Sequence, residues 1–231
     1  MLFANSLHVL CFGDSLTEGM SMGRPHPHPY SIALKSSLEK AFPSFNITTD
    51  NQGVSGDQAT SPPGKFLPRM EKVYEEVHPN NPYNWAIVLG GTNDLSVEYE
   101  IDNIYEALHK VWAIPLSHGT KVLALTVPEC GIDDNPITAH GDELNKLIME
   151  HEAENYYTFD LHNAIPFRGI PDKKRSELWG DPVHFSPKGY DLLGKLLAER
   201  LTELIQAQST DEEAENPEGR TELKKREIAA G

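Results

Sequence analysis

Short apolar runs alternate along this chain with longer segments in which apolar residues recur at helical spacing. The short runs have the length and composition of strands. Trp85–Leu89 is apolar throughout, which is typical of a strand covered on both faces of a parallel sheet. We expect five strands, at Leu7–Phe12, Phe45–Asp50, Trp85–Leu89, Lys121–Val127 and Tyr156–Leu161.

The segments between the strands predict helices. In the first of them, Ile32, Leu34 and Leu38 are expected to face the core. Asp133 and Asp134 are expected to cap a later helix, because aspartate is a preferred N-cap residue. The expected helices are Ser31–Phe42, Pro68–Val77, Ile101–His118, one from Asp133 to about Glu154 and one from Ser186 to about Ala207.

This alternation predicts one α/β domain over residues 1–208. We expect a three-layer α/β/α sandwich with a five-stranded parallel sheet. A common strand order for such a sheet is 2-1-3-4-5, with ligands bound beyond the carboxyl ends of strands 1 and 3. His162–Phe185 shows no clear periodicity and is expected to be a long loop of the kind that is usually functional. The polar residues 209–231 are expected to form a disordered tail.

Composition and charge exclude several classes of partner. The net charge of -15 argues against binding to nucleic acid or to anionic membrane surfaces. No run approaches the roughly 20 apolar residues of a membrane span, and no signal peptide is recognised, so we expect a cytoplasmic protein. Cys11 and Cys130 are expected to be reduced thiols. His26 and His28 lack a third ligand nearby, so no metal is expected. No dinucleotide or P-loop fingerprint predicts a cofactor.

Three glycine-rich loops follow the first three expected strands, and each carries one residue of chemical interest. These residues are Ser15, Gly56 and Asn93. Any one loop could be only a tight turn, and Ser15 alone could be a turn-capping serine. In the order 2-1-3-4-5, however, the three strands are neighbours, so the three loops share one crevice. The loops are Phe12–Gly19, Asn51–Asp57 and Gly90–Asp94.

A catalytic serine needs a base to accept its proton and a third group to orient that base. Asp181 and His184 lie three residues apart, so the carboxylate can bond one ring nitrogen while the other faces a serine. The long loop before them has the reach to return to the crevice. The N–H groups of Ser15 and Gly56 and the Asn93 amide could stabilise an oxyanion. The pattern therefore predicts a Ser-His-Asp site.

Four motifs in this chain resemble the four blocks of the SGNH hydrolases, also called GDSL esterases and lipases. They occur in the family's order and span about Leu7 to Ala207. Pro182 stands where the family often has glycine, and a proline there stiffens the segment. The motifs are Gly13–Leu16, Gly53–Asp57, Gly91–Asp94 and Asp181–His184.

The resemblance implies a flavodoxin-like fold and metal-independent ester hydrolysis. It implies that Ser15 is the nucleophile and His184 the base, with Asp181 orienting the histidine. It also implies that Gly56 and Asn93 complete an oxyanion hole with Ser15. Ser15 lacks the Gly-x-Ser-x-Gly elbow of α/β-hydrolases, which separates the chain from that fold.

We therefore expect a serine esterase that hydrolyses small-molecule carboxylic esters through an acyl-enzyme. The close spacing of the motifs and the lack of a long apolar lid segment favour a short-chain or acetyl group. Two alternatives remain open: an acyltransferase that uses the same Ser-His-Asp site, and a non-catalytic carbohydrate- or partner-binding module. Phe167, Leu178 and Trp179 either wall the acyl pocket or belong to the core.

Overall fold

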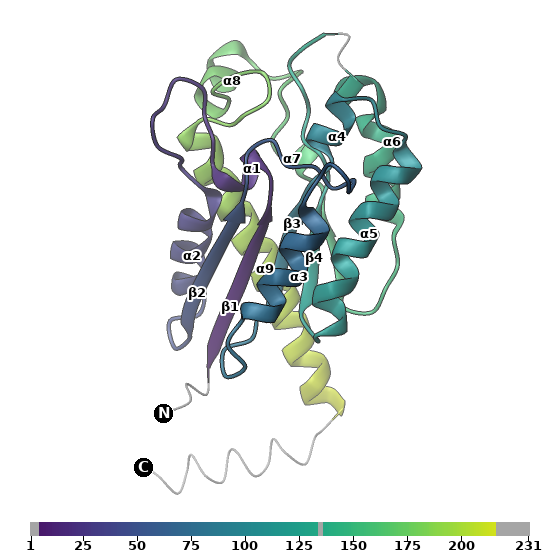
Figure 1. Ribbon diagram of the computed structural model, residues 1–231. Helices are drawn as coiled ribbons and strands as arrows, with labels where there is room; N and C mark the ends of the chain where they lie inside the picture. Colours follow the sequence, from purple (N-terminus) through teal and green to yellow (C-terminus); the bar gives the residue numbers. More distant parts are fainter. Residues whose placement is uncertain (1–4, 134–135, 216–231) are drawn as a thin grey trace, which may run out of the picture.

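The computed structural model describes residues 5–133 and 136–215, and its centre is a parallel sheet of five strands (Figure 1). The strand order is β2-β1-β3-β4-β5, and every neighbouring pair is parallel. Both the predicted order and the predicted α/β class are confirmed. The strands are β1 (Ser6–Gly13), β2 (Asn46–Gly53), β3 (Trp85–Leu89), β4 (Lys121–Leu125) and β5 (Tyr156–Phe159).

Helices cover both faces of the sheet, which confirms the predicted three-layer sandwich (Figure 1). One layer contains α2 and α9, and the other contains α3, α5 and α6. Four shorter helices, α1, α4, α7 and α8, lie in the connections. The bounds are α1 (Ser15–Glu18), α2 (Tyr30–Ala41), α3 (Phe66–Glu76), α4 (Thr92–Ser96), α5 (Ile101–Ser117), α6 (Pro136–Glu150), α7 (Leu161–Ala164), α8 (Asp172–Leu178) and α9 (Pro187–Glu215).

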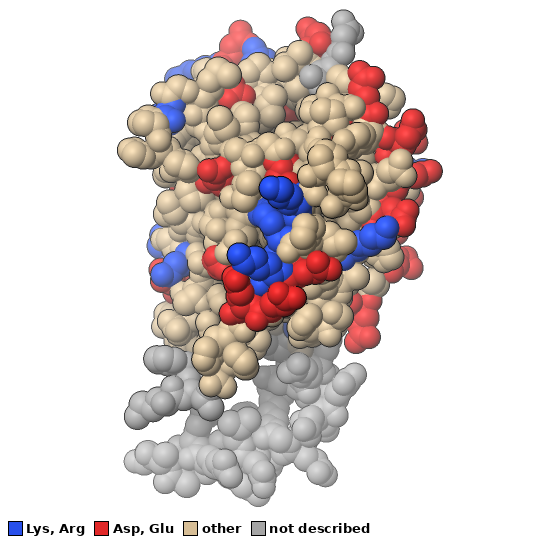
Figure 2. All heavy atoms as spheres, in the orientation of Figure 1, with Lys and Arg blue, Asp and Glu red and all other residues tan. Residues whose placement is uncertain are grey.

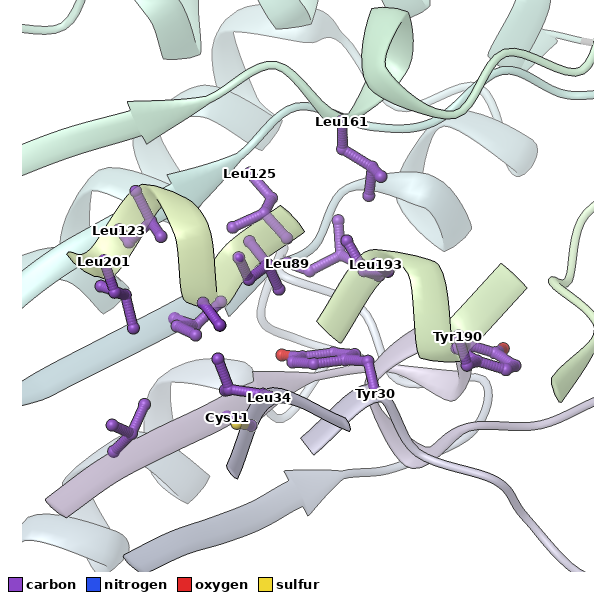
Figure 3. Packing of buried hydrophobic residues seen from close by; sticks show 14 of the residues in the cluster. Cys11, Tyr30, Leu34, Leu89, Leu123, Leu125, Leu161, Tyr190, Leu193 and Leu201 are labelled. Atoms are coloured by element: carbon purple, nitrogen blue, oxygen red, sulfur yellow. The ribbon is translucent and has the colours of Figure 1, made fainter. Parts of the chain in front are cut away.

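Two apolar clusters, one on each face of the sheet, hold the layers together. Successive strand residues point to opposite faces, so in β1 Val9 and Cys11 join the cluster beneath α2 and α9, whereas Leu10 and Phe12 join the other. Figure 3 shows the first cluster, to which Tyr30 and Leu34 of α2 and Leu193 of α9 belong. Burial on both faces explains why β1 and β3 are apolar almost throughout.

Ile32 does not belong to this core. It is 56% exposed, whereas Leu34 and Leu38 are fully buried. Side chains two positions apart on an α-helix point in directions that differ by about 200°, so Ile32 and Leu34 cannot share a face. The expectation that Ile32 packs inward is therefore wrong.

Several expected boundaries also differ from the structure. The expected loop His162–Phe185 contains helix α8 and most of α7, because helices of only one or two turns are too short to show a readable period. β2 is an edge strand that continues to Gly53. Its last residues are polar, so the apolar pattern predicted an end at Asp50, three residues too early. β4 and β5 end earlier than expected, at Leu125 and Phe159.

The last helix, α9, runs beyond the expected end near Ala207 to Glu215. Part of the expected tail is therefore helical. The remainder of that tail, residues 216–231, lies outside the described residues, as does the expected cap Asp134. Among residues 5–133 and 136–215, no helix combines the length and apolarity that a membrane span requires. On the face in Figure 2, the largest group of basic side chains lies over α3 with acidic ones beside it.

Candidate active site

The candidate nucleophile lies in a sharp turn between β1 and α1. Asp14 is the N-cap of α1, and its Oδ1 accepts a hydrogen bond of 2.9 Å from the Leu16 N–H. The end of β2 presses closely on this turn, because a Cβ on Gly53 would lie 2.0 Å from the backbone nitrogen of Glu18. The turn therefore fixes Ser15 at the carboxyl end of β1, next to the central strand β3, with only 7% of the residue exposed.

The structure brings Ser15, His184 and Asp181 together in one chain of contacts. Ser15 Oγ lies 3.0 Å from His184 Nε2. On the other side of the ring, His184 Nδ1 lies 3.0 Å from Asp181 Oδ2 and 3.1 Å from Oδ1. Serine and histidine are 169 positions apart in sequence, so the contact depends on the fold. The two distances of 3.0 Å, from Ser15 Oγ to Nε2 and from Nδ1 to Asp181, are those that proton transfer from a serine to an oriented imidazole requires.

The residues that follow Asp181 stabilise the ionised form of its carboxyl. Burial alone would raise the pKa of its carboxyl, but the Val183 and His184 backbone N–H groups and the His184 ring outweigh that effect, so the pKa is lowered. Both N–H groups donate to Oδ1 at 2.8 Å. A carboxylate that accepts several N–H groups favours the charged state. Asp181 can therefore keep the Nδ1 proton in place and stabilise a protonated ring.

The Asp-His segment is also anchored from outside. The Gly131 N–H donates to the Pro182 carbonyl at 2.7 Å, and the Gly180 N–H donates to the His184 carbonyl at 2.9 Å. Trp179 and Phe185 form an antiparallel bridge on either side of the segment. Trp179 is 5% exposed and belongs to the core, with Phe167 and Leu178 packed against that same cluster. For these three residues the structure favours the core interpretation over a pocket wall.

Gly56 lies in a turn that only glycine adopts without strain. Its φ is +77°, and the Asp57 N–H donates to the Val54 carbonyl at 3.2 Å. A Cβ at Gly56 would meet nothing within 4 Å, so the backbone conformation, and not a lack of space, requires glycine. Among the described residues, neither the Gly56 N–H nor the Ser15 N–H has a hydrogen-bond acceptor. Both are available to an oxyanion.

Asn93 lies in the first turn of α4, beside the Gly56 loop. Its Nδ2 donates to the Asp57 carbonyl at 2.8 Å, which leaves the second amide hydrogen for another acceptor. Asp94, the next residue, accepts from the Ala59 N–H at 2.9 Å and from the Thr60 N–H at 2.8 Å. Two neighbouring residues of α4 thus hold the loop that carries Gly56.

The buried carboxyl of Asp14 is the most perturbed acid beside the nucleophile. Burial raises its pKa from 3.8 to about 7, with the Leu16 N–H opposing that shift. The residue is 1% exposed, and its Oδ2 has no hydrogen-bond partner among the described residues. An unpaired buried oxygen costs most when it is charged. The carboxyl therefore takes up a proton near neutral pH.

Comparison with protein families shows which family the chain belongs to. The model of the GDSL-like Lipase/Acylhydrolase family matches residues 11–192, a range that contains Ser15, Gly56, Asn93, Asp181 and His184. The chain belongs to this family. A GDSL-like acylhydrolase is a carboxylic ester hydrolase, so the comparison favours the esterase interpretation over a non-catalytic binding module.

Solved structures show the same fold as this GDSL-like hydrolase. A lipolytic protein of the G-D-S-L family from Veillonella parvula has 21% identity and a TM-score of 0.65, over 81% of this chain and 94% of its own. Axe2, an acetylxylan esterase from Geobacillus stearothermophilus, has 18% identity and a TM-score of 0.64, over 86% and 95%. A lipase/acylhydrolase from Enterococcus faecalis has 22% identity and a TM-score of 0.64, over 85% and 95%. No curated protein matches the chain in sequence.

The sequence reasoning assigned no role to Asp57 or Asp94, and the structure shows what they do in this GDSL-like hydrolase. Each aspartate directly follows an expected oxyanion donor, and both hold the loop that carries Gly56: Asp57 accepts from the Lys65 N–H, and Asp94 accepts from the Ala59 N–H. That adjacency is a signal that could have found them. Arg69 is a further residue that the sequence did not predict: it donates to Asp57 from α3, 12 positions along the chain, and no motif marks this contact.

Proposed function

We propose that this protein hydrolyses short-chain carboxylic esters through an acyl-enzyme on Ser15. The observation that carries the proposal is the contact of 3.0 Å between Ser15 Oγ and His184 Nε2, with Asp181 on the far ring nitrogen. A serine hydroxyl is a weak nucleophile until a neighbouring base takes its proton. His184 is the base at hydrogen-bond distance, and Asp181 orients it.

In the acylation step, Ser15 Oγ attacks the ester carbonyl carbon and its proton passes to His184 Nε2. The carbonyl oxygen becomes an oxyanion that accepts from the N–H groups of Ser15 and Gly56 and from the Asn93 amide. The C–O bond to the alcohol then breaks, and the leaving alkoxide takes the proton from Nε2. Asp181 stabilises the imidazolium that exists between these two transfers.

In the deacylation step, water attacks the acyl carbon of the ester on Ser15. His184 accepts a proton from that water, and the same three donors hold the second oxyanion. The bond to Ser15 Oγ then breaks, the carboxylic acid is released and Oγ regains its proton from Nε2. The chain's own residues thus supply every proton transfer of the cycle.

Two observations support a short acyl group. Ser15 is 7% exposed and lies in a tight turn, with Gly53 pressing directly on the backbone of that turn. One structure of the same fold is named an acetylxylan esterase. A series of p-nitrophenyl esters from acetate to palmitate tests this part of the proposal. We expect kcat/KM to be highest for the shortest acyl groups, and a preference for long chains would contradict it.

The role of Ser15 is tested by the Ser15→Ala variant with p-nitrophenyl acetate. We expect activity to fall to background, because the variant has no nucleophile. Ser117→Ala is the matched control, since this exposed hydroxyl donates to the Ile114 carbonyl at 2.8 Å and lies 3.2 Å from Nδ1 of the neighbouring His118. A Ser15→Ala variant as fast as the wild type would contradict the proposal. Product analysis with added ethanol separates hydrolysis from transfer to an alcohol, since transfer would yield the ethyl ester.

A further inference from the structure

Arg69 of α3 connects the ends of two strands to the loop that carries Gly56. Its Nε donates to Asp57 Oδ2 at 2.7 Å. Its Nη1 donates to the Gln52 carbonyl at 2.8 Å, and its Nη2 donates to the Gly13 carbonyl at 2.9 Å. Each nitrogen of the guanidinium therefore donates to a different residue.

The arginine is fixed in place as well as bonded. Its side chain is 18% exposed and that of Asp57 is 7% exposed. The guanidinium carbon lies 4.5 Å from the ring centroid of Phe12 and 5.3 Å from that of Phe66. Stacking on two aromatic rings holds the plane of a guanidinium and strengthens the contact. The side chain thus has one defined orientation.

The partners of Arg69 lie directly beside the proposed oxyanion donors. The Gly13 carbonyl precedes Asp14 and Ser15 at the end of β1. Asp57 follows Gly56, and its own carbonyl accepts the Asn93 amide at 2.8 Å. The other oxygen of the Asp57 carboxylate accepts from the Gln58 N–H at 2.9 Å and from the Lys65 N–H at 2.7 Å. One cation therefore contacts the segments that carry Ser15 and Gly56, and it reaches Asn93 indirectly, through Asp57.

We propose that Arg69, through the Asp57 carboxylate and the Gly13 carbonyl, is the positioning residue that holds the Ser15, Gly56 and Asn93 donors at their mutual spacing. The inference rests on the proposed function, because it assumes that these groups stabilise an oxyanion. Arg69 itself does not supply a donor to the oxyanion; it bonds to the Gly13 and Gln52 carbonyls and to the Asp57 carboxylate. A misplacement of about 1 Å can cost about 100-fold in rate, and an oxyanion hole acts only when its donors lie at hydrogen-bond distance from the developing charge, so the distances set by Arg69 affect the rate.

Lysine cannot replace arginine at this position. The three acceptors lie in three directions, and the planar fork of arginine meets them together, whereas a lysine ammonium is a single point. Arg69→Lys keeps the charge and much of the stem but removes at least the separate bonds to the Gly13 and Gln52 carbonyls. It is therefore a test of geometry more than of charge.

The test compares kcat and KM of Arg69→Lys and Asp57→Asn with those of the wild type on p-nitrophenyl acetate. We expect kcat to fall about 10- to 100-fold in each variant, with KM within about 2-fold, because the lost interaction acts on the transition state. The double variant should lose little more than either single one, since both break the same contact. Lys72→Gln is the matched control, one turn along α3, with a side chain that is 69% exposed and pairs with Glu76 on the same helix. It should leave kcat unchanged.

A purely structural role would give a different result. If Arg69→Lys and Asp57→Asn lower the melting temperature but keep the wild-type kcat per active site, counted by titration with a fluorophosphonate, the inference is overturned. If Arg69→Lys does not fold, Asp57→Asn carries the test by itself, because it keeps the size and the backbone carbonyl of residue 57. The proposed function fails separately, when Ser15→Ala retains activity.

Discussion

Replacing Asp181 by asparagine removes one charge from the active site and changes little else. The Asn amide oxygen can still accept from the Val183 and His184 N–H groups, which now donate to Oδ1 at 2.8 Å. The amide nitrogen then faces His184 Nδ1, where a carboxylate oxygen now lies at 3.0 Å. Because that nitrogen donates, it favours the ring with a bare Nδ1 and a proton on Nε2. Such a ring cannot accept the Ser15 proton.

The size of the effect follows from the distance. Two unit charges 3.0 Å apart at an effective dielectric constant of 20 interact by about 5.5 kcal/mol. This sets the order of magnitude of the stabilisation that Asp181 gives to a protonated His184. Since each 1.36 kcal/mol is a factor of ten in rate, we expect kcat to fall about 10³- to 10⁴-fold. Ser15→Ala and His184→Ala should lose more than this, because Asp181 orients a proton acceptor and does not itself transfer a proton.

The assay is the initial rate of p-nitrophenyl acetate hydrolysis at neutral pH, with folding checked by circular dichroism. Asp191→Asn is the matched control. It removes a carboxylate that contacts a different histidine, His28, at 2.8 Å, and it should leave kcat unchanged. A folded Asp181→Asn variant within about tenfold of the wild-type kcat would refute the reasoning, because the electrostatic stabilisation would then be at most about 1.4 kcal/mol.

Two further predictions concern Asn93 and Asp14. Asn93→Ala removes one proposed oxyanion donor and should lower kcat about 100- to 1,000-fold with little change in KM. Steady-state kinetics on p-nitrophenyl acetate check this prediction. A rise in KM of that size with an unchanged kcat would contradict it. Asp14→Asn tests the raised pKa of Asp14. The folded state binds this proton up to about pH 7 and the unfolded state only up to about 3.8, so the free energy of unfolding loses up to about 1.4 kcal/mol per pH unit over that window. Urea unfolding from pH 4 to pH 8 should show Asp14→Asn gaining stability relative to the wild type as pH rises, and a constant difference would contradict the shift.

The strand order and the nearness of the three glycine-rich loops could be predicted from the sequence. β1 and β3 are buried on both faces, so their apolar runs carry a strong signal. The placing of Ser15 against His184 follows from topology, because parallel strands bring their carboxyl ends to one edge. Asp181 lies close to His184 in sequence, so its contact with the ring is local and readable.

Other features depend on packing that no local pattern records. Helices α1 and α4 are about one turn long, and their starts are fixed by the strand ends before them and not by periodicity. The bonds of Arg69 to Gly13, Gln52 and Asp57 join α3 to partners 12 to 56 positions earlier in the chain. Ile32 illustrates the converse, since an apolar residue on a helix can face solvent.

The most direct test of the central proposal is to trap the acyl-enzyme. The wild-type protein is mixed with p-nitrophenyl acetate, quenched in acid within the first turnovers, digested and analysed by mass spectrometry. We predict an acetyl group on the peptide that contains Ser15, located on Ser15 itself by fragmentation and missing from the Ser15→Ala protein. An acetyl group on another residue, at a rate that matches turnover, would contradict the account.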